Sequence, residues 1–360
     1  MDLNICKILL MIVRFIVGIF DRRYSLWPSL LFRIMIWYKR LIRGVTVKYI
    51  EHDGYRFCYL SRGKPGSQPS VLMLHGFSFN KDMWLSAIKL FPKKIHLVCL
   101  DMPGHGETTR LLAENYTAVD QAKKIHQFVE WTKLNRKPFH LVGMSMGGMI
   151  AGVYAALYPN EVCALSLLSP PGLQYTTESE FIKRLKELRE STNSQKNPLV
   201  LMTVQQGEDL LKLGLYNPNK INMQLLKGYL EDRRPHKSFF LKCFLDMSSM
   251  ESRYSLHGNM RKITAPTQII WGKNDKVMDP SGAEILAKAI PDSQMHMLDK
   301  CGHFVTLDRP KKSGKVILEF YYAICGTAKN KTSLYDCLFK TCFLKFIFIL
   351  LSKLRTAHKD

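Results

Sequence analysis

The chain has 360 residues, 46% hydrophobic and 11% aromatic, with a formal net charge of +22 at pH 7. These values exclude a disordered chain and fit one large folded domain with extra segments at its ends, or two small domains. No zinc-finger spacing, aromatic RNA-binding signature or basic zipper is present. A nucleic-acid partner is therefore disfavoured, and a membrane bilayer with anionic lipids is the expected partner of the excess charge.

The N-terminal run 3–20, "LNICKILLMIVRFIVGIF", is nearly long enough to cross a bilayer. Its apolar side chains contribute roughly −5 kcal/mol to insertion, whereas the central Arg14 costs about 2.5 to 3.5 kcal/mol. Lys7 lies nearer the end and reaches the headgroups at lower cost. We expect a marginal span or a deeply buried anchor within an N-terminal membrane segment 1–44. Basic residues follow the run, so the positive-inside bias keeps the rest of the chain in the cytosol.

Two further apolar and basic segments flank the middle of the chain. In "LWPSLLFRIMIWYKRLIRG", Trp27, Trp37 and Tyr38 fit an interfacial helix beside the anchor. An ordinary amphipathic helix packed on the domain is the alternative. The basic, apolar C-terminal extension 326–360 contains "CLFKTCFLKFIFILLSKLR", which fits either a second membrane contact or a helix docked on the core.

Short apolar runs alternate with helical patterns from about residue 45 to residue 325. The run at 45–60 predicts a hairpin that turns at His-Asp-Gly, and helical spacing is found at 119–133. The remaining apolar runs are typical of parallel strands buried on both faces, and they lie at 70–76, 95–101, 139–144, 163–169 and 267–272. This alternation predicts an α/β fold with a mostly parallel central sheet, formed by 45–172 and 262–325.

The alternation stops at 173–261, where four helix-like stretches occur without a strand. The first, "TTESEFIKRLKELRE", opens with capping residues and places Phe181, Leu185 and Leu188 on one face. Helices inserted after the sixth strand of a sheet protein predict a cap over a binding site. A helical subdomain that does not contact substrate is the alternative.

The string "LVGMSMGGMIAG" supplies a candidate nucleophile. Gly143 and Gly147 flank Ser145, with a strand-like run before and a helix-like run after. Missing side chains at both glycines permit a strained strand-to-helix turn that exposes Ser145 beside the N–H groups of a helix N-terminus. A Gly-x-Ser-x-Gly string alone is weak evidence, so the context carries the prediction.

A serine hydroxyl is a poor nucleophile at pH 7 and needs a base, for which His303 in "DKCGHFVTLDRP" is best placed. The base needs an acid to fix its tautomer, and "IIWGKNDKVMDP" offers Asp275 and Asp279. Asp275 is preferred because it lies nearer the strand end, while Asp279 suits a helix cap. The order Ser145, Asp275, His303 is that of an α/β hydrolase.

The remaining machinery is an oxyanion hole. Met146, directly after the nucleophile, supplies one N–H donor, and Phe77 in "LMLHGF" is assigned the second. The nine cysteines are scattered, odd in number and lack a C-x-x-C pair. We therefore expect reduced thiols in a cytosolic domain, no zinc or other metal site, and no cofactor.

These motifs, with "DMPGHG" after the next strand, resemble the α/β-hydrolase family over roughly 45–325. "LMLHGFSFNKDMWL", "KPFHLVGMSMGGMIAGVYAALYP", "PTQIIWGKND" and the "LWPS" linker are similar to its membrane-anchored monoacylglycerol lipases. The resemblance implies hydrolysis of monoacylglycerols to fatty acid and glycerol, with Ser145, Asp275 and His303 as the triad. It also implies a single N-terminal anchor, a cytosolic catalytic domain at late endosomal or lysosomal membranes, and lysophospholipids or related lipid esters as further substrates.

Two other functions stay open. His303 to Asp308 spells H-x-x-x-x-D, a motif associated with acyl transfer in some relatives, although Asp308 fits a helix N-cap. A membrane-tethered binding protein on a hydrolase scaffold is the second alternative, but such proteins normally lose a triad residue. Epoxide hydrolases and dehalogenases are excluded because they carry Asp where this chain has Ser145.

Overall fold

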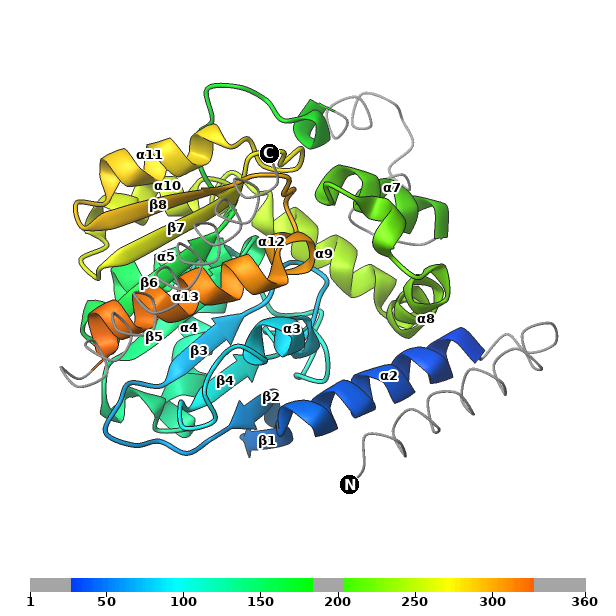
Figure 1. Ribbon diagram of the computed structural model, residues 1–360, viewed down its shortest axis with the longest axis horizontal. Helices are drawn as coiled ribbons and strands as arrows, with labels where there is room; N and C mark the ends of the chain where they lie inside the picture. Colours follow the sequence, from blue (N-terminus) through cyan, green and yellow to red (C-terminus); the bar gives the residue numbers. More distant parts are fainter. Residues whose placement is uncertain (1–26, 184–203, 327–360) are drawn as a thin grey trace, which may run out of the picture.

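The computed structural model describes residues 27–183 and 204–326. An eight-stranded sheet forms its centre, with helices on both faces (Figure 1). The strand order is β1-β2-β4-β3-β5-β6-β7-β8, and the strands from β4 to β8 pair in parallel. This arrangement confirms the predicted fold class.

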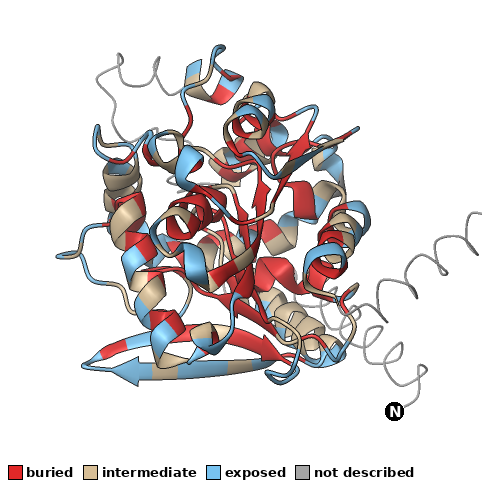
Figure 2. Cartoon of the chain, turned by 90° about the vertical axis from the view of Figure 1, so that its left-hand side faces the viewer, coloured by how far each residue is buried: buried red, intermediate tan, exposed pale blue. Residues whose placement is uncertain are grey.

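The first two strands are the predicted hairpin. β1 (Thr46–His52) and β2 (Tyr55–Arg62) pair antiparallel about a turn at Asp53 and Gly54, both of which have positive φ. β2 continues antiparallel onto β4 (Leu97–Leu100), which joins the hairpin to the parallel part. β1 is a largely exposed edge strand, as Figure 2 shows.

The parallel strands are short and apolar because both of their faces are covered. β3 (Val71–Leu74), β4, β5 (Phe139–Met144) and β7 (Thr267–Gly272) are buried throughout. β6 (Val162–Leu168) lies between β5 and β7, and β8 (Ser293–Leu298) closes the sheet as its second edge. Helices against the two faces are α3 (Leu85–Ile88), α4 (Ala118–Trp131), α5 (Met146–Leu157), α11 (Ser281–Ala289), α12 (Val305–Asp308) and α13 (Pro310–Cys325).

The segment between β6 and β7 forms the cap after the sixth strand. It contains α7 (Val204–Gly214), α8 (Met223–Arg233), α9 (Lys237–Met247) and α10 (Ser255–Asn259). Residues 180–183 are also helical, whereas the rest of the first predicted cap helix lies outside the described residues. Figure 1 places α7, α8 and α9 together on one side of the sheet.

Helix α2 (Trp27–Arg43) connects the N-terminal segment to the sheet and packs along α8. Gly228 permits this approach, because a Cβ there would meet the Pro28 carbonyl oxygen at 2.1 Å. Arg33 and Ser29 both hydrogen bond to Asp232, which fixes the pairing of the two helices. The helix is therefore packed on the domain, as expected for the ordinary amphipathic helix that was the alternative prediction. It still leaves apolar side chains such as Trp37 and Leu41 exposed to solvent.

Within the described residues no helix is long and apolar enough to cross a membrane. The predicted anchor at 3–20 and the second membrane contact at 337–355 lie outside those residues.

Candidate active site

Ser145 stands at a sharp turn between β5 and α5. Its backbone has φ 53° and ψ −123°, a conformation that residues other than glycine rarely adopt. Strand pairing and helix capping hold this conformation, since the Ser145 N–H donates to the Leu168 carbonyl and its own carbonyl accepts from Gly148 and Met149. The turn lifts the hydroxyl above the carboxyl edge of the sheet.

The two flanking glycines make the turn sterically feasible. A Cβ at Gly143 would meet the Gly147 carbonyl oxygen at 2.2 Å, and one at Gly147 would meet the Leu74 carbonyl oxygen at 2.4 Å. In both cases the neighbour is backbone, which cannot move aside as a flexible side chain would. The glycines predicted for the turn therefore lie where the strand, the helix and the loop after β3 come closest.

Replacing Gly147 with alanine is expected to destabilise the protein by about 1–3 kcal/mol, because the new methyl group overpacks two carbonyl groups. Thermal unfolding should show a lower Tm, by several degrees. Gly258→Ala is the matched control, since a Cβ there meets nothing within 4 Å and the residue lies in helix α10. Helix propensity predicts an unchanged or slightly higher Tm for the control. Equal destabilisation of both variants would contradict the steric argument.

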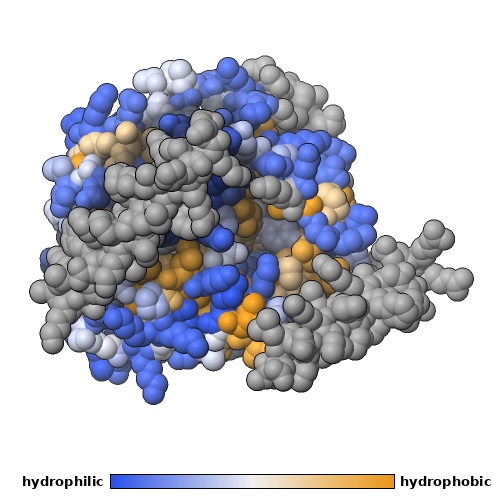
Figure 3. Space-filling view, in the orientation of Figure 1, coloured by the Kyte–Doolittle hydropathy of each residue, from blue (hydrophilic) through white to orange (hydrophobic). Residues whose placement is uncertain are grey.

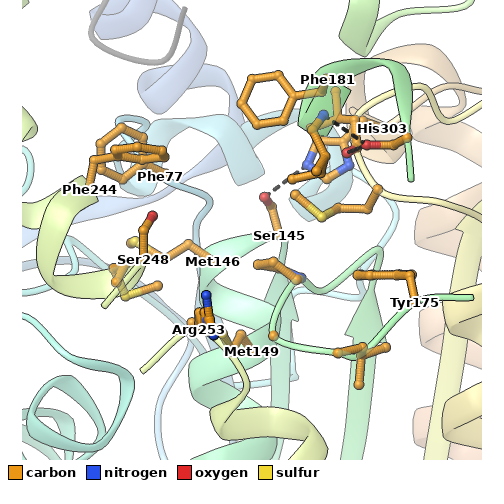
Figure 4. A pocket seen from close by; sticks show the side chains of 18 of the residues that line it. Phe77, Ser145, Met146, Met149, Tyr175, Phe181, Phe244, Ser248, Arg253 and His303 are labelled. Carbon is orange, nitrogen blue, oxygen red and sulfur yellow. Dashed lines mark hydrogen bonds between the residues drawn. The ribbon is translucent and has the colours of Figure 1, made fainter. Parts of the chain in front are cut away.

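Ser145, His303 and Asp275 form a hydrogen-bonded chain (Figure 4). The Ser145 Oγ lies 2.8 Å from His303 Nε2, and His303 Nδ1 lies 2.9 Å from Asp275 Oδ2. His303 is 2% exposed. A carboxylate accepts only, so Nδ1 carries the proton toward Asp275 and Nε2 is left to accept from the serine hydroxyl. This is the tautomer that a general base requires.

Asp275 is held from its other side. Its Oδ1 accepts the N–H groups of Val277 at 2.8 Å and Met278 at 2.9 Å. The backbone thus orients the carboxylate so that Oδ2 faces the imidazole.

The other two aspartates singled out in the sequence, Asp279 and Asp308, contact other groups. Asp279 accepts the N–H of Ser281 at 2.9 Å, where α11 begins. Asp308 does not cap α13, whose preceding residue is Arg309, so the expected N-cap is wrong. Its carboxylate instead accepts the N–H groups of Gly302 and Tyr216, each at 2.8 Å. Asp308 ends α12, and its carboxylate turns back toward the loop before it, where it positions the backbone next to His303.

The loop after β3 brings Phe77 to the same site. A Cβ at Gly76 would lie 3.3 Å from the Ser145 Cβ, so the loop backbone closely approaches the nucleophile. Both Phe77 and Met146 line the pocket around Ser145. Met146 is the first residue of α5, and the first N–H groups of a helix have no intrahelical acceptor. Both residues proposed as oxyanion donors are therefore adjacent to Ser145.

His75, which the motif analysis left without a role, fixes this loop. Its Nε2 accepts the Met102 N–H at 2.9 Å, so its Nδ1 carries the proton and donates to the Gly76 carbonyl at 2.8 Å. Complete burial lowers the pKa of His75 to about 3, which keeps the ring neutral at physiological pH. The ring thus joins the loops after β3 and β4.

A buried ion pair holds the same two loops, and no local sequence signal predicted it. Lys81 Nζ contacts Asp101 at 2.7 Å and Glu107 at 3.0 Å. Burial opposes the ammonium charge, but Asp101 raises the pKa of Lys81 above its usual value. Cys58, Asp101 and Glu107 also have the spacing of a metal site among the described residues, yet the Lys81 ammonium already contacts both carboxylates.

Ser145 opens into a pocket of about 1380 Å³ between core and cap, larger than the roughly 300–1,000 Å³ of a typical ligand site. In Figure 4, Phe77 and Phe244 lie on one side of Ser145 and Phe181 and Tyr175 on the other. The lining is mainly apolar and comes from core and cap alike, including Phe77, Met146, Met149, Phe181, Leu210, Leu241, Phe244, Met247 and Phe304. The cap helices thus contact the space that substrate would occupy.

The sequence and the fold of this chain are similar to those of known hydrolases. Residues 69–310 match the family model described as alpha/beta hydrolase fold. The monoacylglycerol lipase ABHD6 of Rattus norvegicus is 53% identical over 87% of this chain and 93% of its own length, and the Homo sapiens protein is 52% identical over the same shares. A crystal structure of a membrane phospholipase A, described as a bacterial virulence factor, has a TM-score of 0.76 at 25% identity, covering 89% of this chain and all of its own.

Proposed function

Because this chain belongs to the α/β-hydrolase family, we propose that it is a membrane-associated serine hydrolase that cleaves monoacylglycerols to fatty acid and glycerol. The observation that carries the proposal is the hydrogen-bonded chain of Ser145, His303 and Asp275 at an apolar pocket. The high identity with monoacylglycerol lipases over most of both chains supports the substrate class.

The proposed reaction has two steps. In the first, His303 Nε2 takes the proton of Ser145 as Oγ attacks the ester carbonyl, and the N–H groups of Phe77 and Met146 stabilise the oxyanion. The imidazolium then protonates the leaving glycerol oxygen. In the second, His303 removes a proton from water, which attacks the acyl-enzyme, and the imidazolium returns that proton to Ser145 Oγ as the fatty acid leaves. Asp275 stays ionised throughout and stabilises the imidazolium.

The apolar lining of the pocket supports a substrate with an acyl chain. Its apolar side chains suit the hydrocarbon, and Ser145 lies where a carbonyl next to that chain would be attacked. A lysophospholipid fits the same description and is the second candidate, favoured by Arg253 in the pocket lining. Its guanidinium would suit a phosphate group, which monoacylglycerol lacks.

A substrate panel tests the proposal. Purified full-length protein is offered a monoacylglycerol, a lysophospholipid and a triacylglycerol of the same acyl chain in mixed micelles, and released fatty acid is measured. We expect kcat/KM to be at least about tenfold higher for the monoacylglycerol than for the triacylglycerol, in keeping with the high identity to monoacylglycerol lipases. Higher turnover of the lysophospholipid would transfer the assignment to the second candidate. Acyl-CoA-dependent product without hydrolysis would favour a transferase.

Membrane association is proposed from the two ends of the chain and from α2. Trp37 and Leu41 on α2 are 59% and 53% exposed, and basic side chains accompany them on the same helix. Figure 3 shows hydrophobic side chains at the C-terminal end of α2 among hydrophilic ones. An interfacial helix has this combination. The N-terminal anchor and the late endosomal or lysosomal location implied by the resemblance are further parts of this proposal.

Replacing Trp37 and Leu41 together with glutamate is expected to lower turnover of monoacylglycerol in anionic vesicles by about tenfold, because two apolar contacts with the bilayer are lost. Hydrolysis of a short soluble ester should stay within about twofold, since neither residue lines the pocket. Met295→Glu is the control, because Met295 is exposed on the edge strand β8 at the far end of the sheet from β1. An equal loss on both substrates would contradict a role in membrane binding.

A further inference from the structure

Two cysteines that the proposed reaction does not use lie together near the amino end of strand β6, whereas Ser145 follows the carboxyl end of β5. Cys163 is the second residue of β6, and Cys325 is the last residue of α13. Their sulfur atoms are 3.5 Å apart, although 162 positions separate them in the sequence. Both side chains are partly exposed, so a small soluble reagent has access to them.

We propose that Cys163 and Cys325 form a reversible disulfide, a redox modification site that links the start of β6 to the end of α13. A disulfide has a sulfur–sulfur length of about 2.05 Å, so closure needs a sulfur movement of about 1.5 Å. Side-chain rotation of two residues at element ends supplies a movement of that size.

The strand geometry directs Cys163 toward its partner. Val162 pairs with Phe139 and Ala164 pairs with His140, which leaves Cys163 as an extra residue between two consecutive pairs. Such a bulge re-aims a side chain and ends regular pairing locally. Cys163 is accordingly less buried than its neighbours in β6.

The Cys163 thiol differs in acidity from the buried thiols described. The hydrogen bond from Cys325 lowers the pKa of Cys163. Cys325 ends a helix, where the partial negative charge disfavours a thiolate, so Cys163 is the attacking sulfur. Burial instead raises the pKa of Cys58 and of Cys301, each to about 12, which leaves those thiols protonated.

The oxidant is a small soluble disulfide such as glutathione disulfide. The Cys163 thiolate attacks one glutathione sulfur, forming a mixed disulfide and releasing one glutathione thiolate. The Cys325 thiol loses its proton to solvent and attacks the Cys163 sulfur, which releases the second glutathione. The two electrons lost by the cysteine pair thus reduce one glutathione disulfide to two thiols.

The location of the pair predicts what the bond changes. Cys163 lies at the amino end of β6, whereas Ser145 follows the carboxyl end of the neighbouring β5. The cross-link therefore leaves the proposed active site unaltered. It closes a loop that contains the cap, Asp275 and His303, which restricts the unfolded chain and stabilises the folded one.

Peptide mapping of the full-length protein in glutathione redox buffer tests the proposal. Tryptic fragments 137–183 and 316–329 each contain one cysteine, Cys163 and Cys325, and neither contains Cys337 or Cys342. After acid quenching and alkylation, we expect the two fragments to be joined in the oxidised protein and separate in the reduced protein. A Tm about 5–10 °C higher after oxidation should accompany the link.

Two variants make the result decisive. Cys163→Ser and Cys325→Ser should each abolish the link and the Tm shift, while hydrolysis of a soluble ester stays within about twofold of wild type in both redox states. Cys163→Ala replaces the serine variant if that variant fails to fold. Oxidised protein in which Cys325 joins Cys337 or Cys342 would overturn the proposal, as would a stable glutathione adduct on Cys163 without a cross-link.

Discussion

Ser145→Ala is expected to lower ester hydrolysis by about 10⁵–10⁶-fold. The Ser145 hydroxyl is the group within hydrogen-bonding distance of His303 Nε2, and without it no acyl-enzyme forms. Binding of substrate in the apolar pocket should persist, so the loss appears in kcat far more than in KM. Released fatty acid measured under single-turnover conditions gives the value.

A fluorophosphonate probe supplies the independent readout. Wild-type protein should be labelled on Ser145, and Ser145→Ala should not be labelled. Ser248→Ala is the matched control, because Ser248 also lines the pocket but has no described hydrogen bond to a histidine. The control should label like wild type. Labelling of the Ser145 variant, or residual hydrolysis within about tenfold of wild type, would refute the proposed nucleophile. Folded wild-type protein that the probe fails to label would favour a binding role for the protein.

Asp275→Asn is expected to lower kcat by about 10⁴-fold while the fold stays intact. The asparagine carbonyl can still accept the N–H groups of Val277 and Met278, so its amide nitrogen faces His303 Nδ1. That nitrogen donates, which forces the imidazole proton onto Nε2. The base is then in the wrong tautomer to accept from Ser145.

Asp279→Asn is the matched control for this substitution. Asp279 lies four residues further along the same loop, and its carboxylate accepts the Ser281 N–H, a bond that an asparagine oxygen can retain. We expect kcat within about threefold of wild type and an unchanged Tm. If the two variants lost activity equally, the assignment of Asp275 as the orienting acid would be wrong.

Much of the fold was predictable because parallel strands buried on both faces must be continuously apolar. The runs at 139–144 and 267–272 coincide with β5 and β7, and the hairpin turn falls at Asp53 and Gly54. Strand ends were less predictable, since β3 and β4 are each four residues long within longer apolar runs. Apolar residues continue past a strand wherever the loop that follows is also buried.

The candidate site was predictable to the extent that its chemistry needs fixed residue types. Ser145 required small neighbours and a base, and few loops of the sequence offered a histidine or an acid after a strand. Asp308 shows the limit, because it was expected to be a helix N-cap, whereas its carboxylate contacts the backbone of Gly302 and Tyr216. Tyr216 belongs to the cap, and no local pattern encodes a contact across 92 positions.

The elements, their alternation and the order of Ser145, Asp275 and His303 follow from the amino-acid sequence alone, because these depend on local periodicity and on side-chain chemistry. Which distant groups meet depends on the folded arrangement of the whole chain. Lys81 contacts Asp101, Tyr229 of the cap donates to the Ser78 carbonyl beside the loop of Phe77, and Cys163 reaches Cys325. Such contacts arise from how the sheet and helices pack as a whole, and packing is a property of the entire chain rather than of any stretch of it.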